Sequence, residues 1–321
     1  RSNGMKKLKQ FLPIVVLVAI AFGVYAFNLN NGLFWDDDDW IINNNFVHNI
    51  SWDNIKFWFS ENVLAGIGLK SNYYRPVLFF TFALNYLITG IKPLIWHLAS
   101  NLLHIANGVL IFSILYRVSR KKLVAFVTAL VFLIHPLQTE AVTYISGRGD
   151  PLGVFFMLLA LWLFIKSEAP HSLRGSTSQL EVAPLRTFQG SISKHWVWLV
   201  GALLSMVLAI LSRETAIMLP FLLVVVYITF LSKTSFWRSL RQSIVKVLPY
   251  FAVVVVYGIL RLTVLNFNNT LNFYQQSNVY SENLHVRLFT FMHVLADYAR
   301  LLIWPTGLHM ERSTTVHTSL F

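Results

Sequence analysis

Residues 11–27 read FLPIVVLVAIAFGVYAF, and residues 31–40 shortly after them read NGLFWDDDDW. The first stretch carries no charge, and its 17 residues form a helix of about 25 Å, close to the hydrocarbon thickness of a bilayer. The second stretch holds four consecutive aspartates, whose charges repel one another and resist burial. Such a run needs cationic partners, a metal ion or a shared proton, so it indicates a reactive site at a membrane surface.

The composition makes the chain a polytopic membrane protein. It is 55% hydrophobic and only 12% charged, and its apolar blocks of about membrane-spanning length alternate with short polar stretches. The net charge of +12 does not indicate nucleic-acid binding, because the basic residues gather on one set of loops, as the positive-inside rule describes. No cysteine is present, which excludes disulfides, thiolate zinc sites and cysteine nucleophiles.

We predict an all-α helix bundle with about seven or eight transmembrane helices. Residues 1–10 are the expected cytoplasmic N-terminus, and the first span stays as an anchor because no small-residue cleavage site follows it. Residues 11–321 form one transmembrane domain, with an outer loop at 28–93 and a flexible cytoplasmic linker at 167–195. The predicted spans are 11–27, 94–116, 123–138, 152–166, 196–211, 216–231 and 248–265.

Two further segments are expected at the outer membrane surface. Within the outer loop we predict two interfacial helices, one in the aromatic stretch around Trp52 and one that begins at Pro76. Residues 287–304 are long enough to cross, but burying Asp297 and Arg300 in the bilayer is expensive. We therefore expect a helix at the outer interface, with an eighth span as the alternative, and an ion pair between these two residues.

Polar side chains gather on the predicted outer face. His97, Asn101 and His104 fall at i, i+4 and i+7, so they share one face of a helix in the outer half of the bilayer. Polar groups at this depth indicate function by default, although interhelical hydrogen bonds are an equal alternative. Arg148 and Arg213 stand at outer helix ends, where a guanidinium can hold a phosphate through two parallel hydrogen bonds.

Each of these patterns also has a structural explanation. Asp150 precedes a proline and can be a simple helix cap. Glu140 and Arg148 can pair across a loop, and the aspartate run can be a solvated charge cluster or a nonspecific divalent-ion site. The combination nevertheless favours a site for a lipid-phosphate-linked sugar.

The motifs also resemble a known family when they are taken in order. They are Asn31-Gly-Leu-Phe-Trp-Asp-Asp37, Ile41 with Asn43 or Asn44, Tyr74-Arg75-Pro76, Asn85-Tyr86, His97 with Asn101 and His104, His135-Pro136, Thr139-Glu140-Ala-Val142, Gly147-Arg148, Arg213-Glu214-Thr215, Arg261-Leu262, Arg287, and Leu301-Leu-Ile-Trp-Pro305 with Leu308. Over about Asn31 to Leu308, the chain resembles the membrane domain of the transmembrane and tetratricopeptide-repeat O-mannosyltransferases and their prokaryotic relatives.

The resemblance implies a GT-C glycosyltransferase that moves a sugar, expected to be mannose, from a polyprenyl phosphate to a Ser or Thr hydroxyl of a polypeptide. Asp36 or Asp37 would be the catalytic base, and a single displacement would invert the anomeric centre. Arg75, Arg148 and Arg213 would hold the donor phosphate. The expected substrate-binding or supporting residues are His97, Asn101, His104, His135, Glu140 and Glu214. A divalent cation, Mn²⁺ or Mg²⁺, is the candidate cofactor, with Asp36, Asp37, Asp38 and Asp39 as its ligands.

The implied setting is a bacterial plasma membrane, in contact with membrane lipids and with the site on the extracytoplasmic side. The chain departs from the family pattern at Arg213, where Lys is usual, at Ala216, where Gly is usual, and in its two extra aspartates. No tetratricopeptide repeat is found, so we expect a shortened chain that begins naturally at Met5. The alternatives are a related transferase that acts on lipid or glycan, and a transporter without enzymatic activity.

Overall fold

A computed structural model describes residues 2–172, 186–267, 278–309 and 315–318. Within these ranges the regular secondary structure is entirely helical. The α-helices are α1 (Ser2–Tyr25), α2 (Trp52–Ser60), α3 (Pro76–Thr89), α4 (Pro93–Ser119), α5 (Lys122–Ile134), α6 (Gln138–Thr143), α7 (Gly149–Ser172), α8 (Arg186–Ser212), α9 (Leu219–Val226), α10 (Phe236–Leu262), α11 (Val279–Glu282) and α12 (Leu284–Ile303). Short 3₁₀ or π turns join them at η1 (Ala26–Asn30), η2 (Asp38–Ile42), η3 (Asn45–Val47), η4 (Ala65–Ile67), η5 (Ser146–Arg148), η6 (Glu214–Met218) and η7 (Tyr227–Leu231).

Six helical segments of the described chain are long and apolar enough to cross a membrane. They are Phe11–Asn30, Pro93–Ser119, Ser146–Glu168, His195–Ser212, Glu214–Leu231 and Phe236–Leu262. Each overlaps one predicted span, and the chain is therefore a polytopic integral membrane protein. The remaining predicted span, 123–138, corresponds to α5, a shorter apolar helix of 13 residues that packs against α4 and α1.

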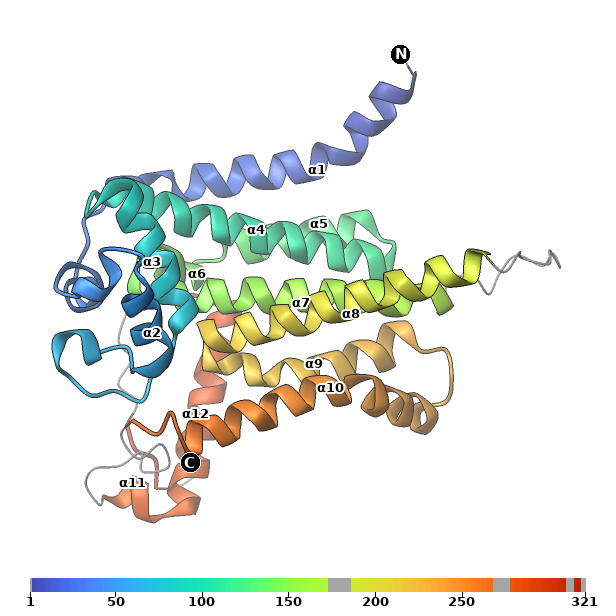
Figure 1. The fold of residues 1–321 in the computed structure, drawn as a ribbon. Helices are drawn as coiled ribbons and strands as arrows, with labels where there is room; N and C mark the ends of the chain where they lie inside the picture. Colours follow the sequence, from blue (N-terminus) through green and yellow to red (C-terminus); the bar gives the residue numbers. More distant parts are fainter. Residues whose placement is uncertain (1, 173–185, 268–277, 310–314, 319–321) are drawn as a thin grey trace.

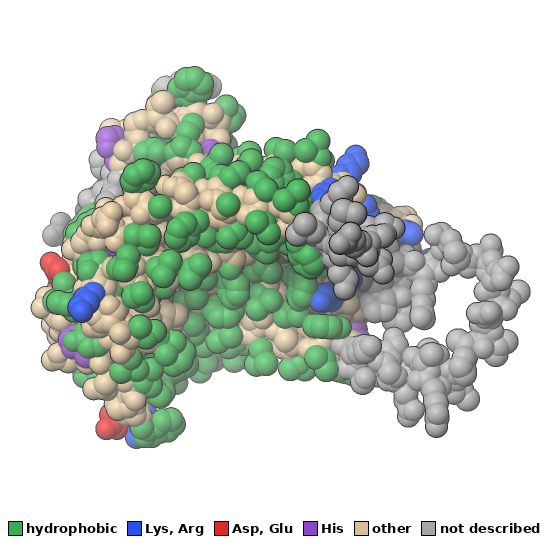
Figure 2. Space-filling model, turned by 90° about the horizontal axis from the view of Figure 1, so that it is seen from above, with side chains coloured by type: hydrophobic (Ala, Val, Ile, Leu, Met, Phe, Trp, Pro, Cys, Tyr) green, Lys and Arg blue, Asp and Glu red, His purple; other side chains and the backbone are tan. Residues whose placement is uncertain are grey.

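The loops lie at the two ends of the bundle as the predicted alternation requires. In Figure 1 the long helices run side by side, with α2, α3, α6 and α11 at one end and the α4–α5 and α9–α10 turns at the other. We call these the loop end and the turn end. Figure 2 shows an apolar surface along the middle of the molecule and several Lys and Arg side chains near the turn end.

The structure changes the bounds of the predicted linker 167–195 and shows the direction of the predicted helix at 287–304. The expected linker 167–195 is shorter than predicted, because 167–172 continue α7 and 186–195 belong to α8, while 173–185 lie outside the described residues. The predicted helix at 287–304 is α12, which crosses the long helices instead of running beside them (Figure 1). Asp297 and Arg300 form the predicted ion pair at 3.7 Å, and both are about half exposed.

The two helices predicted in the outer loop are present as α2 and α3. Ser51 caps α2 by accepting a hydrogen bond from the Asn54 amide at 3.2 Å, and Pro76 occupies the first turn of α3. Large side chains of the loop, among them Trp40 and Trp58, are buried against α3 and α4. Burial of each such side chain contributes roughly 1.5–3 kcal/mol, so the loop that carries the aspartates is fixed to the bundle.

Candidate functional site

The aspartate run begins in a tight turn that Asp37 holds in place. Trp35 adopts a left-handed backbone conformation with φ of 60°, which costs a residue with a side chain roughly 1–2 kcal/mol. The Asp37 carboxylate returns to the turn and accepts a hydrogen bond from the Phe34 amide at 3.1 Å. Its other oxygen accepts two bonds from Ser146, one from the amide at 2.8 Å and one from the hydroxyl at 2.5 Å. Asp37 thus joins the outer loop to the start of α7.

These contacts separate the two aspartates of the expected catalytic pair. Asp37 is fully buried, and both of its oxygens are occupied. Burial raises the pKa of its carboxyl above the usual range, while the hydrogen bonds from Ser146 and Phe34 oppose this shift. Asp36 is only partly buried. The geometry therefore gives Asp37 an anchoring position and leaves Asp36 as the accessible carboxylate.

Tyr144 connects the aspartate run to the neighbouring loop. Its ring lies 5.5 Å from that of Phe34 and 6.0 Å from that of Trp35, between ring centroids. Burial raises the pKa of the Tyr144 phenol, and the nearby Asp36 raises it further. The phenol therefore stays protonated at neutral pH and places a neutral hydroxyl beside Asp36.

The arrangement does not fit the expected metal site. Among the described residues, no three His, Asp or Glu side chains converge as metal ligands would. Asp37 directs its oxygens at Phe34 and Ser146, whereas Asp38 is exposed in the helical turn η2. We therefore derive no chemical step from a divalent ion here.

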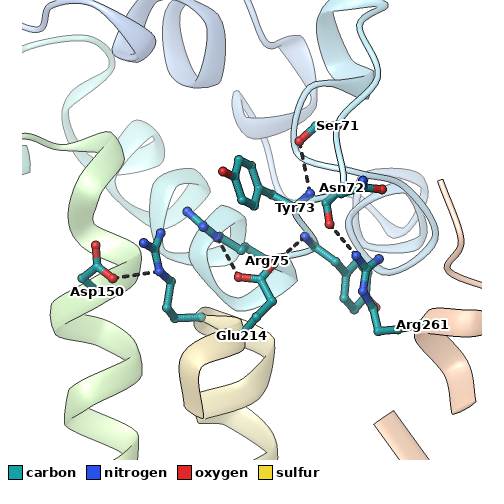
Figure 3. Close-up of polar contacts among 9 residues, drawn as sticks. Ser71, Asn72, Tyr73, Arg75, Asp150, Glu214 and Arg261 are labelled. Carbon is teal, nitrogen blue, oxygen red and sulfur yellow. Dashed lines mark hydrogen bonds and ion pairs between the residues drawn. The ribbon is translucent and has the colours of Figure 1, made fainter. Parts of the chain in front are cut away.

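A second group of charges lies where α3, α7 and η6 meet. Arg213 forms an ion pair with Asp150, with 2.8 Å between Nε and the carboxylate oxygen, and Arg75 donates from Nε to Glu214 at 3.4 Å. Glu214 also accepts a hydrogen bond from the Tyr74 amide at 3.0 Å. In Figure 3, Asp150, Arg75 and Glu214 lie in a row, with Arg261 at its far end. We call Arg75, Asp150, Arg213 and Glu214 the charge row.

The two arginines of the charge row differ in access. Arg75 is almost fully buried, and its guanidinium lies 4.7 Å from the Tyr73 ring centroid and 5.7 Å from that of Trp40. Arg213 is 29% exposed, and within the described residues its terminal nitrogens have no hydrogen-bond partner. Arg213 therefore offers the donors that an anionic ligand can reach, with Arg75 behind it as a fixed positive charge.

Two glycines at the start of α7 allow this approach. A Cβ atom on Gly153 would lie 2.8 Å from the Arg213 Cβ, and one on Gly149 would lie 3.3 Å from the Ser212 carbonyl oxygen. Real Cβ atoms essentially never come as close as the first of these distances. The absence of a side chain at these positions lets the end of α8 and Arg213 pack directly on the start of α7, which brings Asp150 to Arg213.

Arg148 does not occupy the expected phosphate position. It is buried in the bundle, where it donates to the Ser100 hydroxyl at 3.1 Å, to the Asn85 side-chain oxygen, and to the Trp96 carbonyl at 2.8 Å. It also makes no ion pair with Glu140. Arg148 is near an outer helix end in sequence, but its side chain points back into the core and links α3, α4 and η5.

The polar side chains of α4 mainly form hydrogen bonds to neighbouring segments. Asn101 and Asn28 exchange two amide hydrogen bonds of 2.8 and 2.9 Å, which ties the end of α1 to α4. His104 is bonded through Nε2 to the Leu133 carbonyl of α5 at 3.0 Å. These contacts correspond to the interhelical alternative. His97 is fully buried near Asp37, so it is the member of this face that lies closest to the aspartate run.

A cavity of about 500 Å³ opens beside the aspartate run. Its walls include Phe34 and Tyr144 on one side and Tyr298 and His309 of the α12 region on another, with Glu140 of α6 in its lining. Burial raises the pKa of Glu140, the charge of Asp150 raises it further, and Arg213 opposes the shift. Glu140 is therefore within electrostatic reach of the charge row, and it is the carboxylate in the lining of the cavity.

His135 fixes the position of α12 beside this cavity. Its Nδ1 accepts a hydrogen bond from the Leu137 amide at 3.3 Å, so its Nε2 carries the proton and donates to the Leu302 carbonyl at 3.1 Å. The ring thus connects the α5–α6 turn to α12 through these hydrogen bonds. It contacts no group of the charge row.

Comparisons with known proteins identify relatives but no solved structure. A Caenorhabditis elegans protein named Protein O-mannosyl-transferase F38B6.6 is 25% identical over 98% of the chain and 40% of its own length. Mouse (Mus musculus) TMTC3 is 32% identical over 50% of the chain, and human (Homo sapiens) TMTC1 is 36% identical over 42% of it. The chain is thus similar in sequence to proteins named as TMTC protein O-mannosyl-transferases. No protein-family model and no solved structure matches it.

The chain spans only part of these TMTC relatives: the matches cover 17% of mouse TMTC3 and 16% of human TMTC1.

The structure adds residues that the motifs did not single out. Ser146 holds Asp37, Tyr144 flanks Asp36, and Gly149 and Gly153 admit the arginines. The available signal was the set of small residues Ser146, Gly147 and Gly149 on either side of Arg148, because small residues allow close helix contacts.

Proposed function

We propose that this protein is a membrane glycosyltransferase that moves a sugar, mannose in our proposal, from a polyprenyl phosphate to a Ser or Thr hydroxyl of a polypeptide. The names of its relatives support protein O-mannosyl transfer. The observation that carries the proposal for this chain is the cavity of about 500 Å³ that Phe34, Glu140 and Tyr144 line. The partly buried Asp36 lies beside Tyr144, and Glu140 is within electrostatic reach of the partly exposed Arg213. We further propose that the loop end faces the extracytoplasmic side of a bacterial plasma membrane, because the turn end carries the basic loops.

In the proposed reaction, the acceptor hydroxyl oxygen attacks the anomeric carbon of the sugar. The new carbon–oxygen bond forms as the bond from that carbon to the phosphate oxygen breaks, and the electron pair leaves with the polyprenyl phosphate. Asp36 takes the hydroxyl proton, while Asp37 and Ser146 keep the turn in position. A single displacement of this kind inverts the anomeric configuration. A positioned base contributes typically 10²–10⁴ in rate.

The donor phosphate is proposed to bind at Arg213. The Asp150 carboxylate orients the guanidinium through Nε, which leaves its terminal nitrogens for two parallel bonds to phosphate oxygens. The ion pair between Arg75 and Glu214 lies next to this guanidinium. The two arginines and two carboxylates of the charge row cancel, so a bound phosphate has no excess of positive charge to hold it after transfer, which favours release.

The test uses radiolabelled polyprenyl phosphomannose and membranes that contain the protein. The proposal predicts label in a Ser/Thr peptide. Because the anomeric configuration is inverted, this label should be released by the mannosidase (α or β) that is specific for the anomer opposite to that of the donor. Label in a lipid or free glycan would instead identify the related transferase that acts on those acceptors. Label that crosses the bilayer and stays on the polyprenyl phosphate would identify a transporter, and either result would overturn the proposal.

A further inference from the structure

A basic pocket lies at the turn end, away from the charge row and the cavity. It has a volume of about 290 Å³ between α1, α4, α5 and α7. Four cationic side chains line it: Arg117, Arg120, Lys122 and Lys166. Among the described residues that form its lining there is no carboxylate. Three of these cations, Arg117, Arg120 and Lys166, form no ion pair within the described part of the chain, so the pocket attracts an anion.

The convergence of these charges is more than the positive-inside rule requires. That rule explains cations on the α4–α5 turn, but it does not bring Lys166 of α7 to the same place. The Lys166 amine is held between two indole rings, 3.5 Å from the Trp162 ring centroid and 4.6 Å from that of Trp198. This cation–π contact fixes the charge in the pocket wall.

Arg117 supplies a second independent observation. Its Nε atom is buried and has no hydrogen-bond partner in the structure. A buried donor without a partner is destabilising, so this donor needs an acceptor that the described side chains do not supply. Arg120 ends α4 with a left-handed φ of 58°, a strained conformation that turns the chain toward α5 at the pocket. An oxyanion in the pocket would satisfy Arg117 and balance the positive charge.

The other walls show which anion fits. Phe11 and Ile14 of α1, Phe112 and Tyr116 of α4 and Trp162 of α7 are apolar or aromatic. Phe11 is 57% exposed on the membrane-facing surface of α1, so the pocket continues into an apolar surface. A ligand with a phosphate and an attached hydrocarbon chain matches both parts. We propose that this pocket binds the phosphate headgroup of an anionic phospholipid from the leaflet at the turn end.

Native mass spectrometry of the detergent-purified protein tests the proposal, with dioleoyl phosphatidylglycerol and dioleoyl phosphatidylcholine as probes. We expect tighter binding of phosphatidylglycerol, and a loss of about fivefold in its apparent affinity in Arg117→Gln or Lys166→Gln, since each basic residue near an anionic lipid is worth about 1 kcal/mol. Lys233→Gln removes one exposed charge from the same end outside the pocket and should leave the affinity unchanged. Arg117→Lys keeps the charge and should lose less than Arg117→Gln.

Three results would overturn the proposal. The first is equal binding of the two lipids by the wild-type protein. The second is the same loss in Lys233→Gln as in Lys166→Gln, which would mean that net charge and not this pocket attracts the lipid. The third is full displacement of phosphatidylglycerol by millimolar inorganic phosphate, which would identify a free-anion site. The folded state of each variant is checked by its thermal unfolding midpoint in the same detergent.

Discussion

Ser146→Ala should destabilise the protein in a way that depends on pH. The Ser146 hydroxyl donates to the buried Asp37 carboxylate at 2.5 Å, while the Ser146 amide keeps its own bond to the same oxygen. A hydrogen bond to an ionised group is worth about 1.5–3 kcal/mol, and one between neutral groups about 0.5–1.5 kcal/mol. The substitution should therefore cost more when Asp37 is ionised than when it is protonated.

The direction of this pH dependence follows from the raised pKa of the Asp37 carboxyl. Burial raises its pKa in the folded protein above the usual value of 3.8, so its ionisation lowers stability as the pH rises through the folded pKa. The Ser146 hydroxyl limits this loss, because it stabilises the charged form. Without the hydroxyl the folded pKa rises further, and the gap between variant and wild type widens toward high pH.

The assay is the thermal unfolding midpoint of the purified protein in detergent between pH 8 and pH 4. At roughly 2 °C per kcal/mol for a chain of this size, Ser146→Ala should lower the midpoint by about 3–6 °C at pH 8 and by about 1–3 °C at pH 4. The matched control is Ser212→Ala, since Ser212 is also buried but donates to the Leu208 carbonyl at 2.7 Å. Its loss should not change with pH, and an equal, pH-independent loss in both variants would refute the anchoring role of Asp37.

Three further predictions follow from other parts of the structure. Arg213→Ala should raise the KM for the polyprenyl donor at least tenfold, and Arg213→Lys should rescue it only in part, because an ammonium cannot form the two parallel bonds of a guanidinium; an unchanged KM in both variants would place the phosphate elsewhere. Arg148→Met should lower the unfolding midpoint by several degrees, because it removes three buried hydrogen bonds, and a midpoint equal to wild type would contradict its core role. A single cysteine at the exposed Lys70 should react with an impermeant thiol reagent on intact cells while one at the exposed Lys121 should not; the reverse pattern would place the site in the cytoplasm.

The membrane-spanning helices could be predicted because hydropathy is a local property of the sequence. Six predicted spans coincide with long apolar helices, and the helix that starts at Pro76 was signalled by the proline itself. Prediction was less accurate for segments whose secondary structure depends on packing against neighbouring helices. The expected linker contained Pro170 and several small residues, yet its flanks extend α7 and α8 because those two helices pack against each other along their length.

The site was harder to predict than the fold. Charge type and order along the chain located Asp36, Asp37, Arg213 and Glu214, but they did not reveal which partner each residue would meet. Arg148 looked equivalent to Arg213, and only the positions of Ser100, Asn85 and Trp96, 48 to 63 residues away in sequence, make one a core residue and the other accessible. Contacts of this range carry no local signal in a single sequence.

In the proposed reaction, transfer depends on Asp36, which takes the proton of the acceptor hydroxyl. The most direct measurement compares transfer of labelled mannose from polyprenyl phosphomannose to a Ser/Thr peptide by the wild-type protein, Asp36→Asn and Asp38→Asn, with unfolding midpoints measured alongside. We expect Asp36→Asn to lose about 10²–10⁴ in rate at an unchanged midpoint, because Asn has nearly the same shape but cannot accept the proton. Asp38→Asn, at an exposed position, should only reduce the rate. Wild-type transfer by Asp36→Asn would contradict the claim and make Glu140, in the lining of the cavity, the next carboxylate to test.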